Sequence, residues 1–322
     1  MNATLTVVVD ALYRQGRDNL AVSLVAEPGH KLPAWEPGAH VDVHLGNGLV
    51  RQYSLTGCHT ELNRYLICVA RERQSRGGSR YVHESLRPGQ VITISPPRNV
   101  FPLIPAGKII LIAAGIGITP LYAMAEQLEA AAIPFVLHYY VRERANAAFL
   151  GELFRPFTHG FCEVWYSGEG YSPREHLPVE LRYPAADTHL YLCGPEGFMA
   201  HIRHRASEKG WLDSQIHSEA FTPAPAPPTT SQDDVFFISL ASTGQQWPVP
   251  AGKSIAAVLQ ENGVSVPLSC EMGMCGACLT PVKQGRVDHR DTVQSVAEKT
   301  AEDQQIALCC SRSLSRCIVI DL

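Results

Sequence analysis

Residues 269–282 read SCEMGMCGACLTPV, and the spacing of the cysteines in this stretch decides how the rest of the chain is interpreted. Cys270, Cys275 and Cys278 follow the pattern C-x4-C-x2-C, with further cysteines downstream. This is the plant-type arrangement in which four thiolates hold a [2Fe–2S] cluster. Three ligands come from one tight loop, and the small residues between them let the loop backbone approach the inorganic sulfides. The stretch predicts a domain that transfers electrons one at a time.

The fourth ligand falls in the sequence ALCCSRS, where Cys309 and Cys310 are adjacent. Neighbouring side chains of a strand point to opposite faces, so only one of the two can reach the irons. The residues alone leave this choice open. A structural zinc site in a binding module is an alternative for the same cysteines, although zinc sites usually consist of paired C-x2-C knuckles.

Length and composition limit the kind of protein. The chain has 322 residues, which predicts two or three domains. It is 45% apolar and 18% charged, as globular proteins are, and its net charge of -4 argues against a nucleic-acid surface. The longest apolar run, residues 109–118, is shorter than the ~18 residues of a membrane span, and the N-terminus does not resemble a signal peptide. We therefore expect a cytoplasmic protein without membrane or nucleic-acid partners, whose cysteines are ligands rather than disulfides.

Changes in composition mark the domain boundaries. Residues 222–232, TPAPAPPTTSQ, favour an extended polyproline II linker of at most ~30 Å. Short alternating runs separated by Pro-Gly and Asn-Gly turns predict an antiparallel β-barrel over residues 1–103. Strands that alternate with helices predict a parallel α/β nucleotide-binding domain over residues 104–221. The cysteine pattern lies in the remaining domain, residues 233–322.

Hydrophobic periodicity locates the elements of the first two domains. We expect barrel strands at residues 4–10, 21–26, 40–45, 64–70 and 91–95. We expect the α/β strands at residues 108–113, 135–141, 162–167 and 189–193, and the α/β helices at 120–132, 145–154 and 196–209.

Two glycine turns indicate a nucleotide site. The sequence IAAGIGITP, residues 112–120, joins a predicted strand to a predicted helix. Gly115 and Gly117 allow a tight turn there, and the helix start would present free N–H groups to a pyrophosphate. The second turn, Cys193-Gly194-Pro195, ends another strand at the same carboxyl edge, where ligands bind in such sheets. Glycines at strand–helix turns also occur for purely structural reasons, but two such turns at one edge favour nucleotide binding.

Two stretches of the predicted barrel suit a flavin phosphate. In Arg51-Gln52-Tyr53-Ser54-Leu55 the arginine can pair with a phosphate, and the tyrosine can lie against a planar ring. In Arg76-Gly77-Gly78-Ser79 backbone N–H groups, a hydroxyl and a cation make a phosphate nest. An ordinary hairpin turn is the alternative for either stretch alone. Both stretches in one barrel, directly before a nucleotide-type sheet, favour a flavin.

Taken in order, the motifs RQYSL, RGGS, AAGIGITP, YLCGPEGFM and CEMGMCGAC resemble those of the phthalate dioxygenase reductase family, in particular the reductase subunits of vanillate demethylases. The resemblance covers essentially the whole chain. It implies an FMN-binding barrel, an NADH-binding domain and a C-terminal β-grasp domain with the [2Fe–2S] cluster. The first two domains are similar to ferredoxin–NADP reductase, but the short loop at residues 76–79 fits FMN better than FAD.

The resemblance also implies a function. Members of this family are reductase components that pass electrons from NADH to a Rieske-type non-haem iron oxygenase, and here we expect a partner that acts on a small, aromatic organic acid. An acceptor of another kind, such as a diiron monooxygenase or a separate ferredoxin, is the alternative. Because the chain must dock transiently on its partner, we expect a monomer.

The family's site residues map onto matching positions of this sequence. The resemblance implies that FMN is held by Arg51, Tyr53 and Ser54, by Gly77, Gly78 and Ser79, and by Cys68, Val69 and Ala70. It implies a pyrophosphate turn at Gly115, Gly117 and Pro120, a nicotinamide site beside Cys193, Gly194 and Pro195, and catalytic roles for Thr119, Cys193 and Phe221, of which Thr119 and Phe221 also contact the flavin. It implies the cluster ligands Cys270, Cys275, Cys278 and Cys309, with Cys310 in a position that is apolar in the family.

The coenzyme preference depends on residues 141–144, Val-Arg-Glu-Arg, after the strand where the adenosine ribose normally lies. An acidic residue there suits a free 2′-hydroxyl, and an arginine suits a 2′-phosphate. Because this loop has both, its residues do not decide. The resemblance favours NADH, with NADPH as the alternative.

Overall fold

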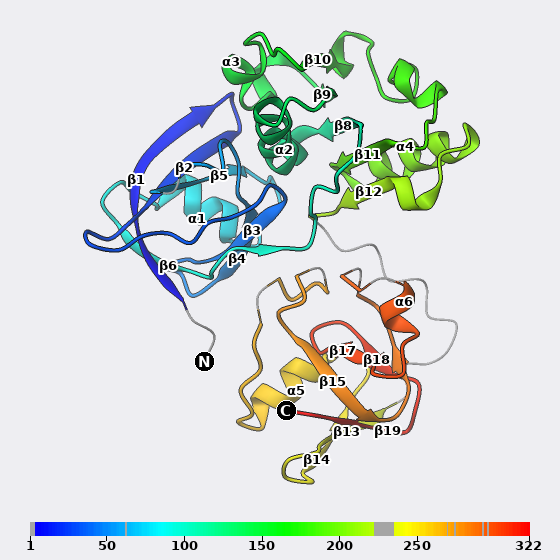
Figure 1. The fold of residues 1–322 in the computed structure, drawn as a ribbon. Coiled ribbons are helices and arrows are strands. Elements are labelled where there is room, and N and C mark those ends of the chain that lie inside the picture. Colours follow the sequence, from blue (N-terminus) through cyan, green and yellow to red (C-terminus); the bar gives the residue numbers. More distant parts are fainter. Residues whose placement is uncertain are drawn as a thin grey trace. The chain divides into compact units, whose positions relative to one another are not determined.

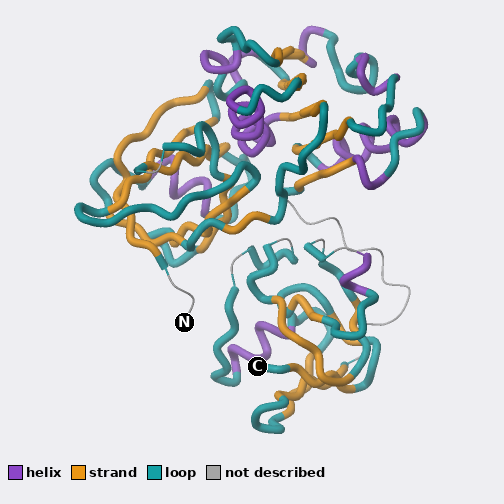
Figure 2. The backbone as a smooth tube through the Cα atoms, viewed as in Figure 1, coloured by secondary structure: helices purple, strands orange, loops and turns teal. Residues whose placement is uncertain are grey.

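The structure is a computed structural model that describes residues 4–61, 63–221, 235–268, 270–273, 275–291, 293–294 and 296–322. The chain divides into two compact units, residues 1–221 and 222–322. Figures 1 and 2 show the elements of each unit. The predicted linker at residues 222–232 lies outside the described residues. The predicted boundaries at residues 103 and 233 stay predictions.

The first unit begins with an antiparallel β-barrel, as predicted, coloured blue to cyan in Figure 1. The strand order is β4-β3-β6-β1-β2-β5 with β7 beside β3, and an antiparallel bridge between Leu55 and Ile67 joins the two ends of the sheet. Apolar side chains that alternate along the strands fill the interior. Sequence patterns did not predict the short helix that begins in the RGGS motif. The bounds are β1 Leu5–Gln15, β2 Asn19–Ala26, β3 Ala39–His44, β4 Val50–Ser54, β5 Arg64–Ala70, α1 Gly78–Glu84, β6 Val91–Ile94 and β7 Arg98–Asn99.

A five-stranded parallel sheet follows in the same unit, in the order β10-β9-β8-β11-β12. Its first strand, β8, is central, so the chain turns to one side for β9 and β10 and to the other for β11 and β12. This reversal is the topological switch point at which such sheets bind nucleotides. The bounds are β8 Lys108–Ala114, α2 Ile118–Ala130, β9 Phe135–Val141, α3 Leu150–Leu153, β10 Gly160–Tyr166, β11 Thr188–Cys193, α4 Glu196–Glu208 and β12 Ile216–Glu219, with short 3₁₀ helices at Gly115–Gly117, Arg144–Asn146, Ser167–Glu169, Val179–Arg182 and Asp213–Gln215.

Helix α2 packs against both halves of the first unit. Leu121 and Met124 lie in the apolar core on the parallel sheet, and Cys68 of barrel strand β5 belongs to that same core. Ala123 of the same helix packs into the interior of the barrel. The barrel wall is thus held beside the carboxyl edge of the parallel sheet.

The helix predicted over residues 145–154 is wrong. Only the 3₁₀ turn at Arg144–Asn146 and the short α3 form there, because Ala147 is extended and Phe149 adopts a positive φ of 59°. The segment binds the tip of the β1–β2 hairpin instead: Asn19 Nδ2 donates to the Asn146 carbonyl at 2.9 Å, and Phe149 N–H donates to Gln15 Oε1 at 2.9 Å. Long-range hydrogen bonds therefore replace those that a helix would have made.

The second unit is the expected β-grasp domain, with the sheet order β14-β13-β19-β15-β17. β13 and β19 are parallel, the other pairs in this sheet are antiparallel, and α5 packs against the sheet core. Ser254 caps α5 by accepting the Ala257 N–H at 3.1 Å. None of the helices that the described residues form is long and apolar enough to span a membrane. The bounds are β13 Phe236–Leu240, β14 Gln246–Val249, α5 Ile255–Glu261, β15 Leu279–Gln284, β16 Val287–Asp288, α6 Val296–Lys299, β17 Gln305–Ala307, β18 Arg312–Ser313 and β19 Cys317–Ile320.

Candidate electron-transfer sites

Four cysteines of the second unit form two pairs of interacting thiols, and a fifth, Cys310, also hydrogen-bonds to Cys309. Cys270 and Cys275 hydrogen-bond to each other, which raises the pKa of the Cys275 thiol. In the second pair, the hydrogen bond between Cys278 and Cys309 lowers the pKa of Cys278 and raises that of Cys309. Cys270, Cys275 and Cys278 are buried, and Cys309 is half-buried. Two irons that share four thiolates need two sulfur ligands each, so this pairing fits a [2Fe–2S] cluster.

The backbone of the ligand loop is shaped to surround sulfur. Gly273 and Gly276 have φ values of 73° and 72°, a conformation that glycine adopts without steric cost. The N–H groups of Met272 and Ala277 donate to the cysteine thiols two residues before them, at 3.3 and 3.5 Å. Hydrogen bonds to sulfur of this kind help to set the potential of an iron–sulfur cluster.

The two adjacent cysteines have different surroundings. The Cys309 thiol interacts with Cys278, a ligand of the C-x4-C-x2-C motif. The Cys310 thiol hydrogen-bonds to Cys309 but not to a cysteine of that motif, and it fills the space beside Gly273, where a Cβ would lie 2.4 Å from Cys310 Sγ. The assignment of Cys309 as the fourth ligand stays a prediction, and this arrangement supports it.

A side-chain oxygen occupies the predicted flavin phosphate loop. Ser75 Oγ accepts hydrogen bonds from the N–H groups of Gly77 and Arg80, at 3.1 and 3.3 Å, and from the Ser79 hydroxyl at 3.0 Å. These are the donors that a phosphate oxygen would use, so Ser75 marks the anion position. Sequence reasoning missed Ser75, although a serine two residues before a glycine is a known turn signal.

Arg51 packs closely against this loop, and it can do so because residue 78 is a glycine. A Cβ on Gly78 would lie 2.7 Å from Arg51 Cγ and 2.9 Å from its Nε. The guanidinium also donates to the carbonyls of Val50 and Arg76, at 2.7 and 3.4 Å. The loop therefore has a cation beside Arg76 and Gly78, which fits the phosphate of FMN.

The strands expected to contact the flavin ring lie in the barrel wall. Tyr53 packs against the barrel interior, and burial raises the pKa of its phenol. Ser54 and Cys68 are buried, and Ala70 is half-buried at the end of β5. The Val69 carbonyl accepts a hydrogen bond from His83 Nε2 at 2.9 Å. Because this carbonyl already accepts a hydrogen bond, it is a weaker candidate than the other backbone groups of β5 for bonding to the flavin ring.

The two predicted glycine turns meet at the carboxyl edge of the parallel sheet. A Cβ on Gly117 would lie 2.2 Å from the Cys193 carbonyl oxygen and 2.7 Å from the Gly194 nitrogen. Gly115 has a φ of 57°, and a Cβ added there would meet none of the described atoms within 4 Å. The two glycines therefore do different things: Gly117 lets the turns pack, and Gly115 leaves open backbone where a pyrophosphate is expected.

The other expected site residues surround this edge with different degrees of exposure. Thr119 is buried, and its hydroxyl donates to the Ile116 carbonyl at 3.0 Å within the turn. Pro120 is buried in the first turn of α2, whereas Pro195 is exposed before α4. Phe221 packs partly buried against the core that contains Cys68. The roles of these residues toward a cofactor stay predictions.

Sequence reasoning missed one acidic side chain at this edge. Glu219 of β12 pairs in register with Cys193 of β11, and Glu219 Oε2 is buried without a hydrogen-bond partner among the described residues. Burial raises the pKa of Glu219 to about 8. Burial raises the pKa of the Cys193 thiol as well, and the Glu219 carboxylate adds to that shift. The burial of an isolated Glu in a short strand cannot be predicted from the sequence, because the residues that surround it come from the neighbouring strand.

The barrel also contacts the loop expected to hold the adenosine ribose. At the tip of the β1–β2 hairpin, a Cβ on Gly16 would lie 2.7 and 2.8 Å from the carbonyls of Ala145 and Ala147. Arg17 of this tip pairs with Glu143 at 3.6 Å across an exposed surface. The hairpin therefore supports the loop that follows β9.

Comparisons with known proteins agree with this arrangement. Residues 238–314 match the family model described as a 2Fe-2S iron-sulfur cluster binding domain. The chain is 41% identical over 319 residues to vanillate O-demethylase oxidoreductase of Pseudomonas sp. (strain HR199 / DSM 7063), covering 99% of this chain and 100% of that protein.

Two solved structures are also similar over the whole chain. Phthalate dioxygenase reductase, described as a modular structure for electron transfer from pyridine nucleotides to [2Fe–2S], is 33% identical with a TM-score of 0.72, covering 99% of this chain and 98% of that one. An intact type IV self-sufficient cytochrome P450 monooxygenase is 33% identical with a TM-score of 0.87, covering 99% of this chain. This chain spans only 41% of that longer protein.

The barrel, the parallel sheet and the cysteine-bearing β-grasp domain define a flavin- and iron–sulfur-containing oxidoreductase that uses a pyridine nucleotide. The chain belongs to the phthalate dioxygenase reductase family. Family membership confirms the expected fold and the expected cofactors, which are FMN, a pyridine nucleotide and a [2Fe–2S] cluster. The alternative of a zinc-stabilised binding module is wrong.

Proposed function

We propose that this chain is the reductase component of a Rieske-type non-haem iron oxygenase system, in which electrons from NADH pass through FMN and [2Fe–2S] to an oxygenase that acts on a small, aromatic organic acid. The observation that carries the proposal is the pairing of Cys270 with Cys275 and of Cys278 with Cys309, in a chain that also has a flavin barrel and a nucleotide sheet. The full-length similarity to vanillate O-demethylase oxidoreductase supports an aromatic acid as the substrate of the whole system.

The first unit provides the binding surfaces for FMN and NADH. When bound, FMN accepts a hydride and the cluster carries single electrons, chemistry that belongs to the cofactors. Arg51 binds the FMN phosphate together with the N–H groups and hydroxyl that now surround Ser75. Gly115 exposes its backbone to the pyrophosphate of the coenzyme. Glu219, neutral at pH 7, holds a proton on its carboxyl group beside Cys193 at the edge where we expect the nicotinamide.

We also assign NADH rather than NADPH as the coenzyme. Glu143 provides the acidic residue that suits a free 2′-hydroxyl, and Arg17 holds it from the barrel side. The Arg144 guanidinium lies over the Phe154 ring, 5.6 Å from the ring centroid, and makes a cation–π contact with it. We further propose a monomer in the cytoplasm, where the coenzyme is available and the chain docks transiently on its partner.

The acceptor can be tested by reconstitution. The full-length protein with its cofactors is mixed with NADH and a Rieske-type oxygenase component without oxygen, and reduction of the Rieske centre is followed by its absorption. We expect reduction at a rate that depends on both proteins. A diiron monooxygenase component, a separate ferredoxin and a cytochrome P450 are tested in parallel, the last because a P450 structure contains a similar segment. Fast reduction of one of these acceptors with no reduction of the Rieske centre would overturn the proposal.

A further inference from the structure

We infer that Asp291 is a positioning residue for the cluster and that, together with Lys299, it sets the reduction potential of the cluster. The two residues act with opposite sign, because one brings a negative charge and the other a positive charge behind the ligand cysteines. The inference rests on the cluster assignment and does not depend on which protein accepts the electrons.

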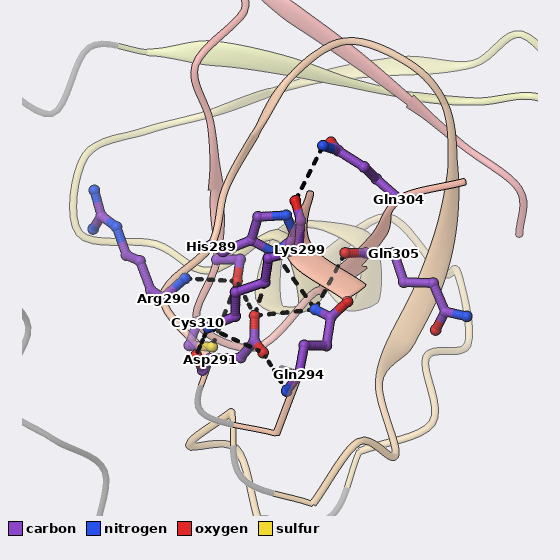
Figure 3. A network of polar contacts seen from close by, with 9 residues as sticks. His289, Arg290, Asp291, Gln294, Lys299, Gln304, Gln305 and Cys310 are labelled. Atoms are coloured by element: carbon purple, nitrogen blue, oxygen red, sulfur yellow. Dashed lines mark hydrogen bonds and ion pairs between the residues drawn. The ribbon is translucent and has the colours of Figure 1, made fainter. Parts of the chain in front are cut away.

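Asp291 lies at the centre of a buried polar network in the second unit (Figure 3). Its side chain is fully buried, with 0% exposure. The carboxylate accepts hydrogen bonds from the backbone N–H of Gln294 at 3.0 Å and from the side-chain amide of Gln294 at 3.2 Å. The hydroxyl of Ser311 donates to the same carboxylate at 3.4 Å. A buried carboxylate with several donors of this kind is a fixed charge rather than a solvated one.

Asp291 contacts both segments that carry the cluster ligands. On the side of the ligand loop, a Cβ on Gly273 would lie 3.0 Å from Asp291 Cα, and the Val293 N–H donates to the Gly273 carbonyl at 3.2 Å. On the side of the fourth ligand, Ser311 follows directly after Cys310, and the carboxylate acts on the Cys310 thiol. One side chain therefore joins the loop of Cys270–Cys278 to the turn of Cys309.

The cation in this network comes from helix α6. Lys299 Nζ lies 3.8 Å from Asp291 Oδ2 and also donates to the Asp291 carbonyl. The Lys299 side chain is only 25% exposed, so water screens its charge weakly. His289 completes the set, with Nδ1 at 3.5 Å from Asp291 Oδ1. The ligand cysteines thus have a carboxylate and an ammonium group close behind them in a region of low dielectric.

Charge near the cluster acts on its reduction because reduction adds one electron to the cluster. A fixed negative charge disfavours the reduced form, and a fixed positive charge favours it. Removing the Asp291 charge should therefore raise the potential, and removing the Lys299 charge should lower it. If Asp291 only fastened the two segments together, the two changes would not produce shifts of opposite sign.

The test is an anaerobic redox titration of the full-length protein, followed by the EPR signal of the reduced cluster. The variants are Asp291→Asn and Lys299→Gln, which remove each charge with little change in side-chain size, although Asn keeps only one of the two acceptor oxygens of Asp291. We expect the one-electron equilibrium constant to change about tenfold in opposite directions, which is ~59 mV for each variant. Asp321→Asn is the matched control, because Asp321 pairs with Lys283 at 2.8 Å on a half-exposed surface of the same unit.

The Lys299→Gln potential decides the outcome even if Asp291→Asn fails to hold a cluster. A potential below that of the wild type, with Asp321→Asn unchanged, supports the inference. A Lys299→Gln potential equal to or above that of the wild type, or shifts of the same sign in both variants, overturns it. Neither result depends on electron transfer to an oxygenase, so failure here is distinct from failure of the proposed function.

Discussion

The two units assemble their sites in different ways. In the second unit, three of the four proposed cluster ligands lie within the nine residues 270–278, and a tight loop brings them together. In the first unit, the expected cofactor residues come from two barrel strands, a turn before α1, two turns of the parallel sheet and Phe221. A site made by one loop can be recognised from spacing, whereas a site made by distant segments depends on packing between them.

The first prediction tests the part of the cluster site that does not lie in the loop. Cys309→Ala should abolish the cluster, because its thiol is paired with Cys278, whereas Cys310→Ala should retain it. Iron and sulfide content and the visible absorption of each purified variant measure this. The reverse pattern would make Cys310 the ligand and would show that the pairing of thiols does not identify the ligands.

The second prediction tests the packing on which the first unit depends. Gly117→Ala should lower the free energy of unfolding by about 3 kcal/mol, since its Cβ would lie 2.2 Å from the Cys193 carbonyl oxygen. Gly115→Ala, the matched control, should lower the free energy of unfolding by only about 1 kcal/mol. The new methyl enters open space, so the only cost is the positive φ of the backbone at this position. Urea unfolding measures both. Equal losses would mean that the two turns do not pack as described.

The third prediction concerns the phosphate site. Gly78→Ala should weaken FMN binding about tenfold, because the new methyl displaces Arg51, whose charged hydrogen bond is worth about 1.5–3 kcal/mol. Gly151→Ala in α3 is the control, since a Cβ there meets none of the described atoms within 4 Å. Titration of the apoprotein with FMN, followed by flavin fluorescence, measures the affinity. An unchanged FMN affinity in Gly78→Ala would show that Arg51 does not bind the FMN phosphate.

The fourth prediction concerns Glu219 and is measured as a slope against pH. Its pKa is raised from 4.5 to about 8, so between these values the folded chain holds a proton that the unfolded chain has lost. Stability should therefore fall as the pH rises from about 5 to about 8. Glu219→Gln should flatten this fall in a plot of Tm against pH, and the exposed Glu169→Gln should leave it unchanged. An equally steep fall in Glu219→Gln would show that other groups cause it.

The same comparison explains what the sequence could predict. Most strands of the barrel and sheet followed from periodicity, except β7 and β12, which were not predicted, and the cluster loop followed from the spacing of Cys270, Cys275 and Cys278. The helix expected over residues 145–154 failed because hydrogen bonds to a distant hairpin replaced it. Ser75, Glu219 and Asp291 escaped notice for a similar reason, since neighbours far away in sequence give each its environment.

The central claim is that the two units act in series, with the flavin unit before the cluster unit. Cys275→Ser tests it most directly, in one protein and with two electron acceptors. We predict that this variant still oxidises NADH with ferricyanide at the wild-type rate but no longer reduces the Rieske-type oxygenase. Reduction of the oxygenase at the wild-type rate by a Cys275→Ser protein that lacks the cluster would contradict the proposed order.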